Sequence, residues 1–188
     1  MKSRFKNIPD ILTLLRLFLT FILIYFLAKK YSSYYVLLLF TLIFISDMLD
    51  GYAARKLNAE SKAGGIFDSV CDFVYIVFLL VFFNLQDKIP VWFTFVVIIN
   101  FLWFIITSKI IMQNNKNRHA FAFDYIGRFT AVLIYIIPLI AFKFDFVLHA
   151  AVYISSFLSA VTFLYRFYFV LNKLKNKGDV KLWERKYL

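Results

Sequence analysis

The chain alternates between long apolar runs and short polar segments. Six of these runs have about the 20 residues that an α-helix needs to cross a bilayer. A segment surrounded by lipid must satisfy its backbone hydrogen bonds internally, so runs of this length predict helices. The predicted spans are approximately residues 11–28, 34–54, 66–85, 91–112, 124–142 and 146–171.

This pattern predicts an all-α integral membrane fold with six transmembrane helices in a single domain, residues 1–188. A short basic segment, residues 1–9, is expected to lie at the lipid interface, and residues 172–188 form a basic tail. The start of the chain also resembles a secretory signal peptide. However, Arg16 interrupts its apolar stretch and no small-residue cleavage site follows, so we expect no cleavage.

The composition agrees with a membrane location. The chain is 62% hydrophobic and 18% charged, whereas soluble domains average about half and a quarter. Its only cysteine, Cys71, cannot form an intrachain disulfide. His119 and His149 do not have the spacing of metal ligands, so we expect them at the membrane interface.

The net charge of +11 is distributed unevenly between the two predicted sides. Fifteen Lys and Arg residues fall in the N-terminal segment, the second and fourth loops and the tail, and four fall in the other loops. The positive-inside rule therefore predicts a multi-pass protein of the cell membrane with both termini in the cytoplasm. Such a basic collar is attracted to anionic lipid, and we do not expect nucleic acid as a partner.

Four carboxylates interrupt the second and third apolar runs. Asp47 and Asp50 are three residues apart, and Asp68 and Asp72 are four apart, so each pair lies on one face of a helix. The polar, glycine-bearing segment between the runs suits a turn that brings the two pairs together at the cytoplasmic boundary. Acidic groups in a membrane are rare and usually functional. They favour either a hard divalent cation or a cation or proton path through a transporter.

The spacing of this region resembles the signature of the CDP-alcohol phosphatidyltransferase family. The pattern is D-x₂-D-G-x₂-A-R-x₈-G-x₃-D-x₃-D, and residues 47–72 match it at all eight fixed positions. The resemblance implies transfer of a phosphatidyl group from CDP-diacylglycerol to a small alcohol, with release of CMP. It also implies a homodimer.

By the same resemblance, two Mg²⁺ or Mn²⁺ ions are held by Asp47, Asp50, Asp68 and Asp72. Asp72 is also the expected general base for the acceptor hydroxyl. The residues expected to contact the CDP-lipid are Thr13, Gly51, Ala54, Arg55, Ser61 and Gly64.

Two motifs indicate different acceptors. The opening from Asn7 to Arg16 resembles the N-P-N-x-x-T-x-x-R opening of phosphatidylglycerophosphate and cardiolipin synthases, with Asp10 in place of the usual Asn. In contrast, Asp68-Ser69 is more like the phosphatidylserine synthases. On the resemblance of the opening, we expect glycerol 3-phosphate as acceptor. The Asp68-Ser69 pair leaves serine or another small alcohol as the alternative.

An acceptor that carries a phosphate needs a basic pocket. The candidate residues near the cytoplasmic ends of the spans are Arg16, Arg118, Arg128 and Arg166. Each has an ordinary alternative role, because arginine side chains extend to the lipid interface. Arg128 is also placed to pair with Asp124, four residues earlier.

Overall fold

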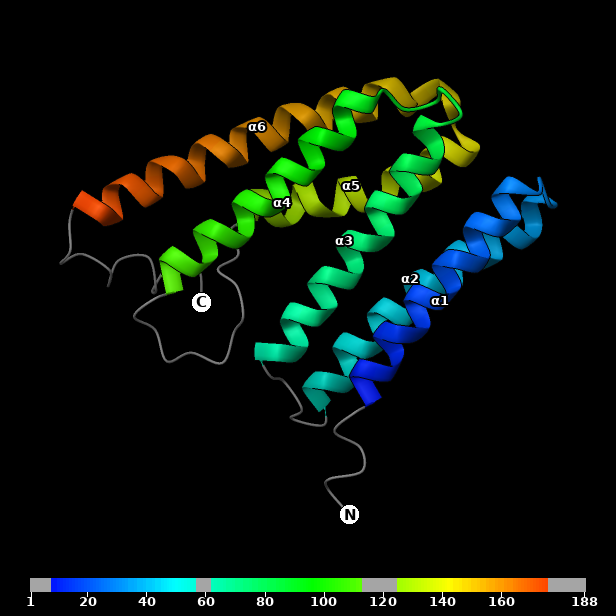
Figure 1. Cartoon of the computed structure of the whole chain (residues 1–188), viewed down its shortest axis with the longest axis horizontal. Helices are drawn as coiled ribbons and strands as arrows, with labels where there is room; N and C mark the ends of the chain where they lie inside the picture. Colours follow the sequence, from blue (N-terminus) through cyan, green and yellow to red (C-terminus); the bar gives the residue numbers. More distant parts are fainter. Residues whose placement is uncertain (1–7, 57–61, 113–124, 176–188) are drawn as a thin grey trace, which may run out of the picture. The chain divides into compact units, whose positions relative to one another are not determined.

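The computed structural model describes residues 8–56, 62–112 and 125–175, and all regular structure in these ranges is α-helical (Figure 1). The predicted all-α fold is therefore confirmed. The helices are α1 (Ile8–Ala28), α2 (Ser33–Lys56), α3 (Lys62–Asn84), α4 (Val91–Met112), α5 (Tyr125–Lys143) and α6 (Asp145–Lys175).

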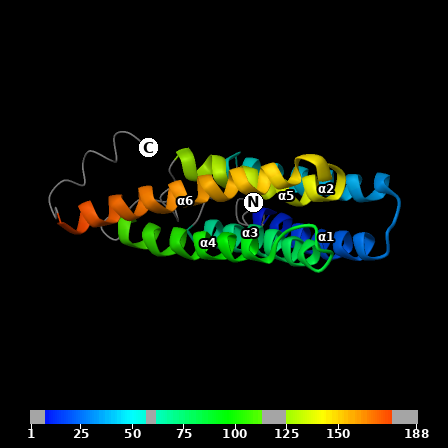
Figure 2. The ribbon, with the colours of Figure 1, turned by 90° about the horizontal axis from the view of Figure 1, so that it is seen from above.

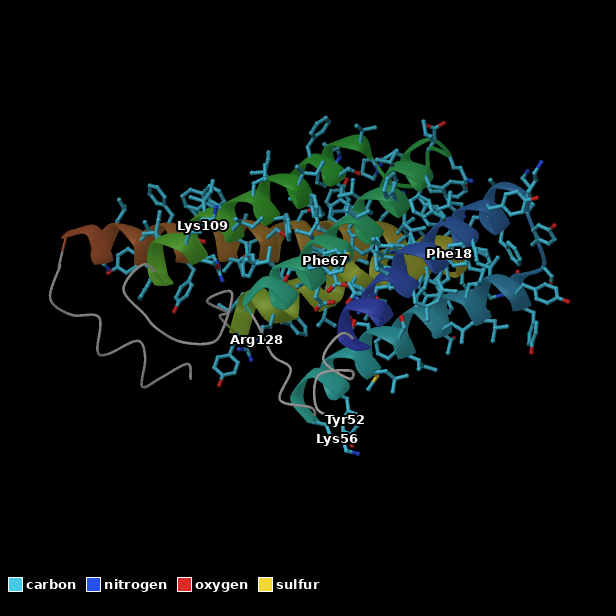
Figure 3. All side chains as sticks on the ribbon, turned by 60° about the horizontal axis from the view of Figure 1, so that its bottom comes forward. Phe18, Tyr52, Lys56, Phe67, Lys109 and Arg128 are labelled. Carbon is cyan, nitrogen blue, oxygen red and sulfur yellow. The ribbon has the colours of Figure 1, made fainter. Side chains whose placement is uncertain are left out.

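Five of the helices, α2 to α6, are long and apolar enough to cross a membrane. In α1 the described apolar stretch is shorter, Thr13–Ala28. Large apolar side chains, Phe18 and Phe67 among them, are exposed along the helices (Figure 3), as expected where lipid covers a surface. The side on which the termini lie stays a prediction, as does the interfacial position of residues 1–9.

The contacts within the chain divide it into two compact units. Unit 1 contains α1, α2 and α3 as far as Phe82, and unit 2 contains the end of α3 with α4, α5 and α6. Whether the chain acts as one domain stays a prediction.

In unit 1, a tight connection folds α1 back beside α2 (Figure 1). The amides of Lys30 and Tyr31 donate to the carbonyls of Leu27 and Phe26, at 3.1 and 3.0 Å, and Lys30 has φ 53°. This pattern is a Schellman motif, which satisfies the last carbonyls of a helix. The Phe26 and Tyr31 rings stack at 4.5 Å and supply the apolar contact that usually accompanies it.

The buried face of α1 is polar at one end and apolar at the other. Thr13, Arg16 and Thr20 are buried at helical spacing, and Leu23 and Leu27 continue the same face. The buried face of α2 shows the same change, from the apolar Ile43 to the polar Ser46 and Asp50. Polar groups buried in a membrane protein require partners, so the two helices direct their polar ends toward one site.

In unit 2, α6 packs against both α4 and α5 (Figure 2). The Trp103 ring of α4 stacks on Phe163 of α6 at 4.7 Å. Ser155 and Ser159 are fully buried on α6, and small side chains of this kind let membrane helices approach closely.

Candidate metal centre and active site

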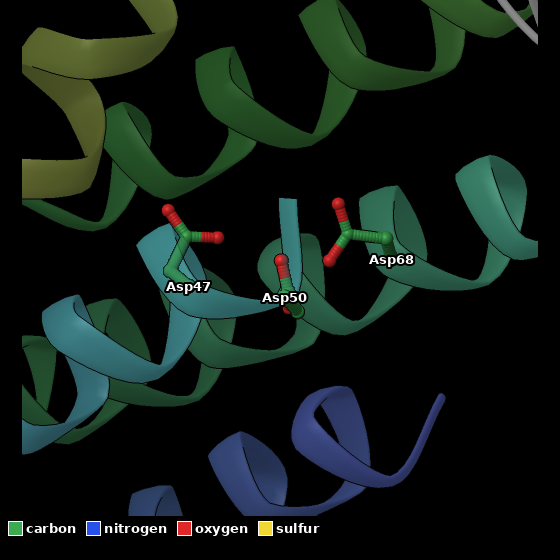
Figure 4. Close-up of side chains that lie close together, drawn as sticks. All are labelled: Asp47, Asp50 and Asp68. Carbon is green, nitrogen blue, oxygen red and sulfur yellow. The ribbon is translucent and has the colours of Figure 1, made fainter. Parts of the chain in front are cut away.

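The four acidic residues of the sequence motif come from two helices of unit 1. Asp47 and Asp50 lie near the end of α2, and Asp68 and Asp72 lie near the start of α3. We call these four residues the aspartate cluster. The carboxylates of Asp47, Asp50 and Asp68 gather between the helices, with ligand oxygens within 4.8 Å of one another (Figure 4). The sequence predicted this convergence.

The convergence follows from the order of the helices. The end of α2 and the start of α3 lie at the same end of unit 1, as Figure 1 shows. Residues 57–61, which connect them, lie outside the described part of the chain. Because each acidic pair is spaced by about one helical turn, both of its carboxylates leave the helix on one face.

A guanidinium group from α1 lies among these carboxylates. Each of its two terminal nitrogens contacts the acidic pair of one helix. Nη2 of Arg16 contacts the α2 pair, with Asp47 Oδ1 at 2.7 Å and Asp50 Oδ2 also in contact. Nη1 contacts the α3 pair, with Asp68 Oδ1 at 3.0 Å and Asp72 Oδ1 also in contact. Arg16 therefore links all four carboxylates, and with them α1, α2 and α3.

The aspartate cluster is only partly enclosed. The side chain of Asp50 is 6% exposed, and the Thr13 hydroxyl donates to its Oδ2 at 3.4 Å. The other three carboxylates are exposed by about one third, between 32% and 40%. A ligand can therefore reach Asp47, Asp68 and Asp72. The buried Asp50 side chain is held by its contacts with Thr13 and Arg16.

The donor set fits a hard divalent cation. Carboxylate oxygens are the ligands that Mg²⁺ and Mn²⁺ prefer. Four ionised carboxylates and one guanidinium leave three uncompensated negative charges. A divalent cation bound by the aspartate cluster would reduce this excess.

The predicted CDP-lipid contacts are described only in part. Gly51 in α2 and Gly64 in α3 are half-buried, and both lie within one turn of a cluster carboxylate. Ala54 and Arg55 belong to α2, but their side chains lie outside the described residues, as does Ser61 as a whole. Thr13 is present at the site through its bond to Asp50.

The four predicted acceptor-binding arginines are distributed differently. Arg16 lies in the aspartate cluster, and Arg118 lies outside the described residues, as does Asp124. Arg128 is exposed on α5 in unit 2. Arg166 is buried on α6, where it donates to the Thr107 hydroxyl at 2.9 Å and stacks on the Phe104 ring at 4.6 Å.

The sequence interpretation missed that Arg16 contacts the carboxylates, because it assigned this residue to acceptor phosphate. The signal was present in the spacing of Thr13, Arg16 and Thr20, which places three polar side chains on one face of an otherwise apolar helix. A charge on such a face within a membrane helix requires an opposite charge nearby.

A family model described as CDP-alcohol phosphatidyltransferase matches residues 6–165, which include the whole aspartate cluster and Arg16. The chain belongs to this family. The resemblance seen in the sequence motif is therefore confirmed.

Curated relatives are named CDP-diacylglycerol–glycerol-3-phosphate 3-phosphatidyltransferase. The one from Aquifex aeolicus (strain VF5) is 40% identical over 83 residues, 44% of this chain and 46% of the relative. Those from Wigglesworthia glossinidia brevipalpis and Escherichia coli (strain K12) are 38% and 34% identical over 77 residues, 40% of this chain and 42% of each relative. The chain thus matches less than half the length of these relatives. No solved structure matches it closely enough to count as a relative.

Proposed function

We propose that this protein transfers the phosphatidyl group of CDP-diacylglycerol to a hydroxyl of glycerol 3-phosphate and releases CMP. The observation that carries the proposal is the aspartate cluster: four carboxylates from α2 and α3 that meet within a family-matched segment. Such a cluster at the end of apolar helices suits a donor with a lipid tail and a charged diphosphate head.

The reaction needs a proton acceptor, and we assign this role to Asp72. The acceptor hydroxyl oxygen forms a new bond to the lipid-side phosphorus, the bond from that phosphorus to the CMP oxygen breaks, and CMP leaves. The hydroxyl proton passes to the Asp72 carboxylate. Asp72 is about one third exposed, so an acceptor hydroxyl can reach it, and it would serve as base in addition to its part in the metal site.

The aspartate cluster would hold two Mg²⁺ or Mn²⁺ ions. When bound, such ions neutralise the diphosphate and stabilise the charge that develops on the departing oxygen. The protein's own contribution is to fix the carboxylates: Thr13 and Arg16 both donate to Asp50, which is the most buried of the four. Gly51, Ala54, Arg55, Ser61 and Gly64 remain our predictions for contacts to the CDP-lipid.

Glycerol 3-phosphate is favoured as acceptor by the names of the curated relatives. The alternative of serine depended on Asp68-Ser69. The Ser69 hydroxyl donates to the Gly65 carbonyl at 2.9 Å, a bond that any serine in a helix can make. This bond does not decide between the two acceptors, so serine stays the alternative.

An acceptor phosphate needs a cationic partner, for which Arg16, Arg118, Arg128 and Arg166 remain our predictions. Arg16 can serve only if it leaves the carboxylates, because its two terminal nitrogens both contact them. We further propose a homodimer in the cell membrane, with the aspartate cluster at the cytoplasmic face.

The test is CMP release from CDP-diacylglycerol by the detergent-purified protein with Mg²⁺, measured separately with glycerol 3-phosphate, serine and inositol. We expect release with glycerol 3-phosphate alone and formation of phosphatidylglycerophosphate. Release with serine in place of glycerol 3-phosphate would show that serine is the acceptor. No release with any alcohol would refute the transferase and favour the cation or proton transporter.

A further inference from the structure

The Arg16 guanidinium occupies the centre of the aspartate cluster. Its side chain is 0% exposed, and it contacts one oxygen of each carboxylate. Three of these carboxylates, those of Asp47, Asp50 and Asp68, are also the ones whose ligand oxygens lie within 4.8 Å of one another (Figure 4). The guanidinium and a divalent cation would therefore use the same carboxylates.

The contacts of Arg16 are incomplete for a permanent structural ion pair. A guanidinium has five N–H donors, and a stable buried pair satisfies nearly all of them. The Nε of Arg16 is buried and has no hydrogen-bond partner among the described residues. The charge is also unbalanced, because one guanidinium faces four carboxylates.

A divalent cation neutralises the negative charge of the aspartate cluster better than the Arg16 guanidinium does. It carries twice the charge of a guanidinium, and that charge is concentrated on one ion that carboxylate oxygens coordinate directly. Coulomb attraction rises with charge and falls with distance. The same carboxylates thus attract a divalent cation more strongly, provided that the guanidinium leaves.

We infer that Arg16 is the internal counter-ion of the metal-free site, and that divalent cations bind by displacing it from the aspartate cluster. This inference rests on the proposed function, since it concerns the same metal site. Arg16 is then a positioning residue: it holds the α2 and α3 carboxylates together while no metal is bound, and it lowers the apparent affinity for metal by competing with it.

The experiment measures Mn²⁺ binding to detergent-purified full-length protein by electron paramagnetic resonance, with thermal unfolding in EDTA as a second readout. The variants are Arg16→Met, which removes the competitor, and Arg16→Lys, which keeps the charge but cannot contact both acidic pairs through a fork. The matched control is Lys56→Met at the end of α2, where Lys56 lies over the Tyr52 ring at 5.4 Å (Figure 3).

We expect Arg16→Met to lower the Kd for Mn²⁺ at least tenfold and Arg16→Lys to lower it by a smaller factor. Lys56→Met should stay within twofold of the wild type. In EDTA, Arg16→Met should unfold at a lower temperature than the wild type, and saturating Mn²⁺ should close most of that gap. If Arg16→Met does not yield folded protein, the Kd of Arg16→Lys decides.

Unchanged or weaker Mn²⁺ binding in the Arg16 variants would overturn the inference, because a competitor's removal must tighten binding. If the wild type still binds Mn²⁺ and releases CMP in that case, the proposed function stands and only the displacement is wrong. If the wild type neither binds Mn²⁺ nor releases CMP, the proposed function itself fails.

Discussion

Arg16 and Asp50 are 34 residues apart in the chain and form an ion pair in which both side chains are buried. The pair joins α1 to α2 at the place where the α3 carboxylates also arrive. A buried charge pair is costly to desolvate and contributes little net stability. Its presence in an apolar helix bundle is therefore better explained by function than by folding.

Replacing Asp47 with Asn should stabilise the metal-free protein. With all four carboxylates ionised, the aspartate cluster has three more negative charges than Arg16 balances, and Asp47→Asn removes one of them while keeping an oxygen that Arg16 can contact. We expect the unfolding temperature in EDTA to rise by about 2–4 °C, as for ~1 kcal/mol in a protein of this size. The increase that Mn²⁺ produces should shrink. A lower unfolding temperature in EDTA with an undiminished Mn²⁺ effect would contradict the account.

Replacing Asp72 with Asn should remove the general base. General-base catalysis contributes about 10²–10⁴-fold to a rate, so CMP release by Asp72→Asn should fall at least 10²-fold. Binding of CDP-diacylglycerol in the presence of metal should persist. The control is Asp145→Asn at the start of α6, an acidic residue that pairs with Lys88 in unit 2. Turnover by Asp72→Asn close to that of the control would refute the assignment.

Much of this architecture was predictable because its signals are local in the sequence. The lengths of the apolar runs predicted the bounds of the helices to within about three residues at most ends, since the bilayer fixes the length of a span. The spacing of Asp47 with Asp50, and of Asp68 with Asp72, placed each pair on one helical face. The structure then brought the two pairs together as predicted.

If Arg128 binds the acceptor phosphate, Arg128→Ala should raise the KM for glycerol 3-phosphate at least tenfold. The KM for CDP-diacylglycerol should change less than twofold, because only the acceptor would lose a charged hydrogen bond. Arg128 is exposed on α5 and is shown in Figure 3. Lys109→Ala on α4 serves as control for the loss of a basic charge in unit 2. Small and equal changes in both KM values would favour the alternative, an ion pair between Arg128 and Asp124.

The predicted orientation can be tested with single cysteines in a Cys71→Ser background. Lys56 at the end of α2 should face the cytoplasm, and Lys29 after α1 should face the other side. A membrane-impermeant maleimide added to intact spheroplasts should label the Lys29→Cys variant. It should label Lys56→Cys only after lysis. The reverse pattern would place the aspartate cluster on the opposite side of the membrane.

The role of Arg16 was harder to predict because it depends on contacts between helices. From sequence alone, an arginine near a helix end has an ordinary explanation in lipid contact. Its partners Asp68 and Asp72 are 52 and 56 residues away in the chain, and no local pattern encodes that approach. Arg166 is a similar case: its contact with Thr107, 59 residues earlier, depends on how α4 packs on α6.

The most direct measurement of the central claim is the metal dependence of CMP release by wild-type protein and by Asp68→Asn. Asp68 is the most exposed carboxylate of the aspartate cluster, so its replacement perturbs the packed core least. We predict no release in EDTA, recovery on titration with Mg²⁺, and at least a tenfold higher Mg²⁺ requirement in Asp68→Asn. Release that persists in EDTA, or a Mg²⁺ requirement unchanged by the substitution, would contradict a metal site built from these carboxylates.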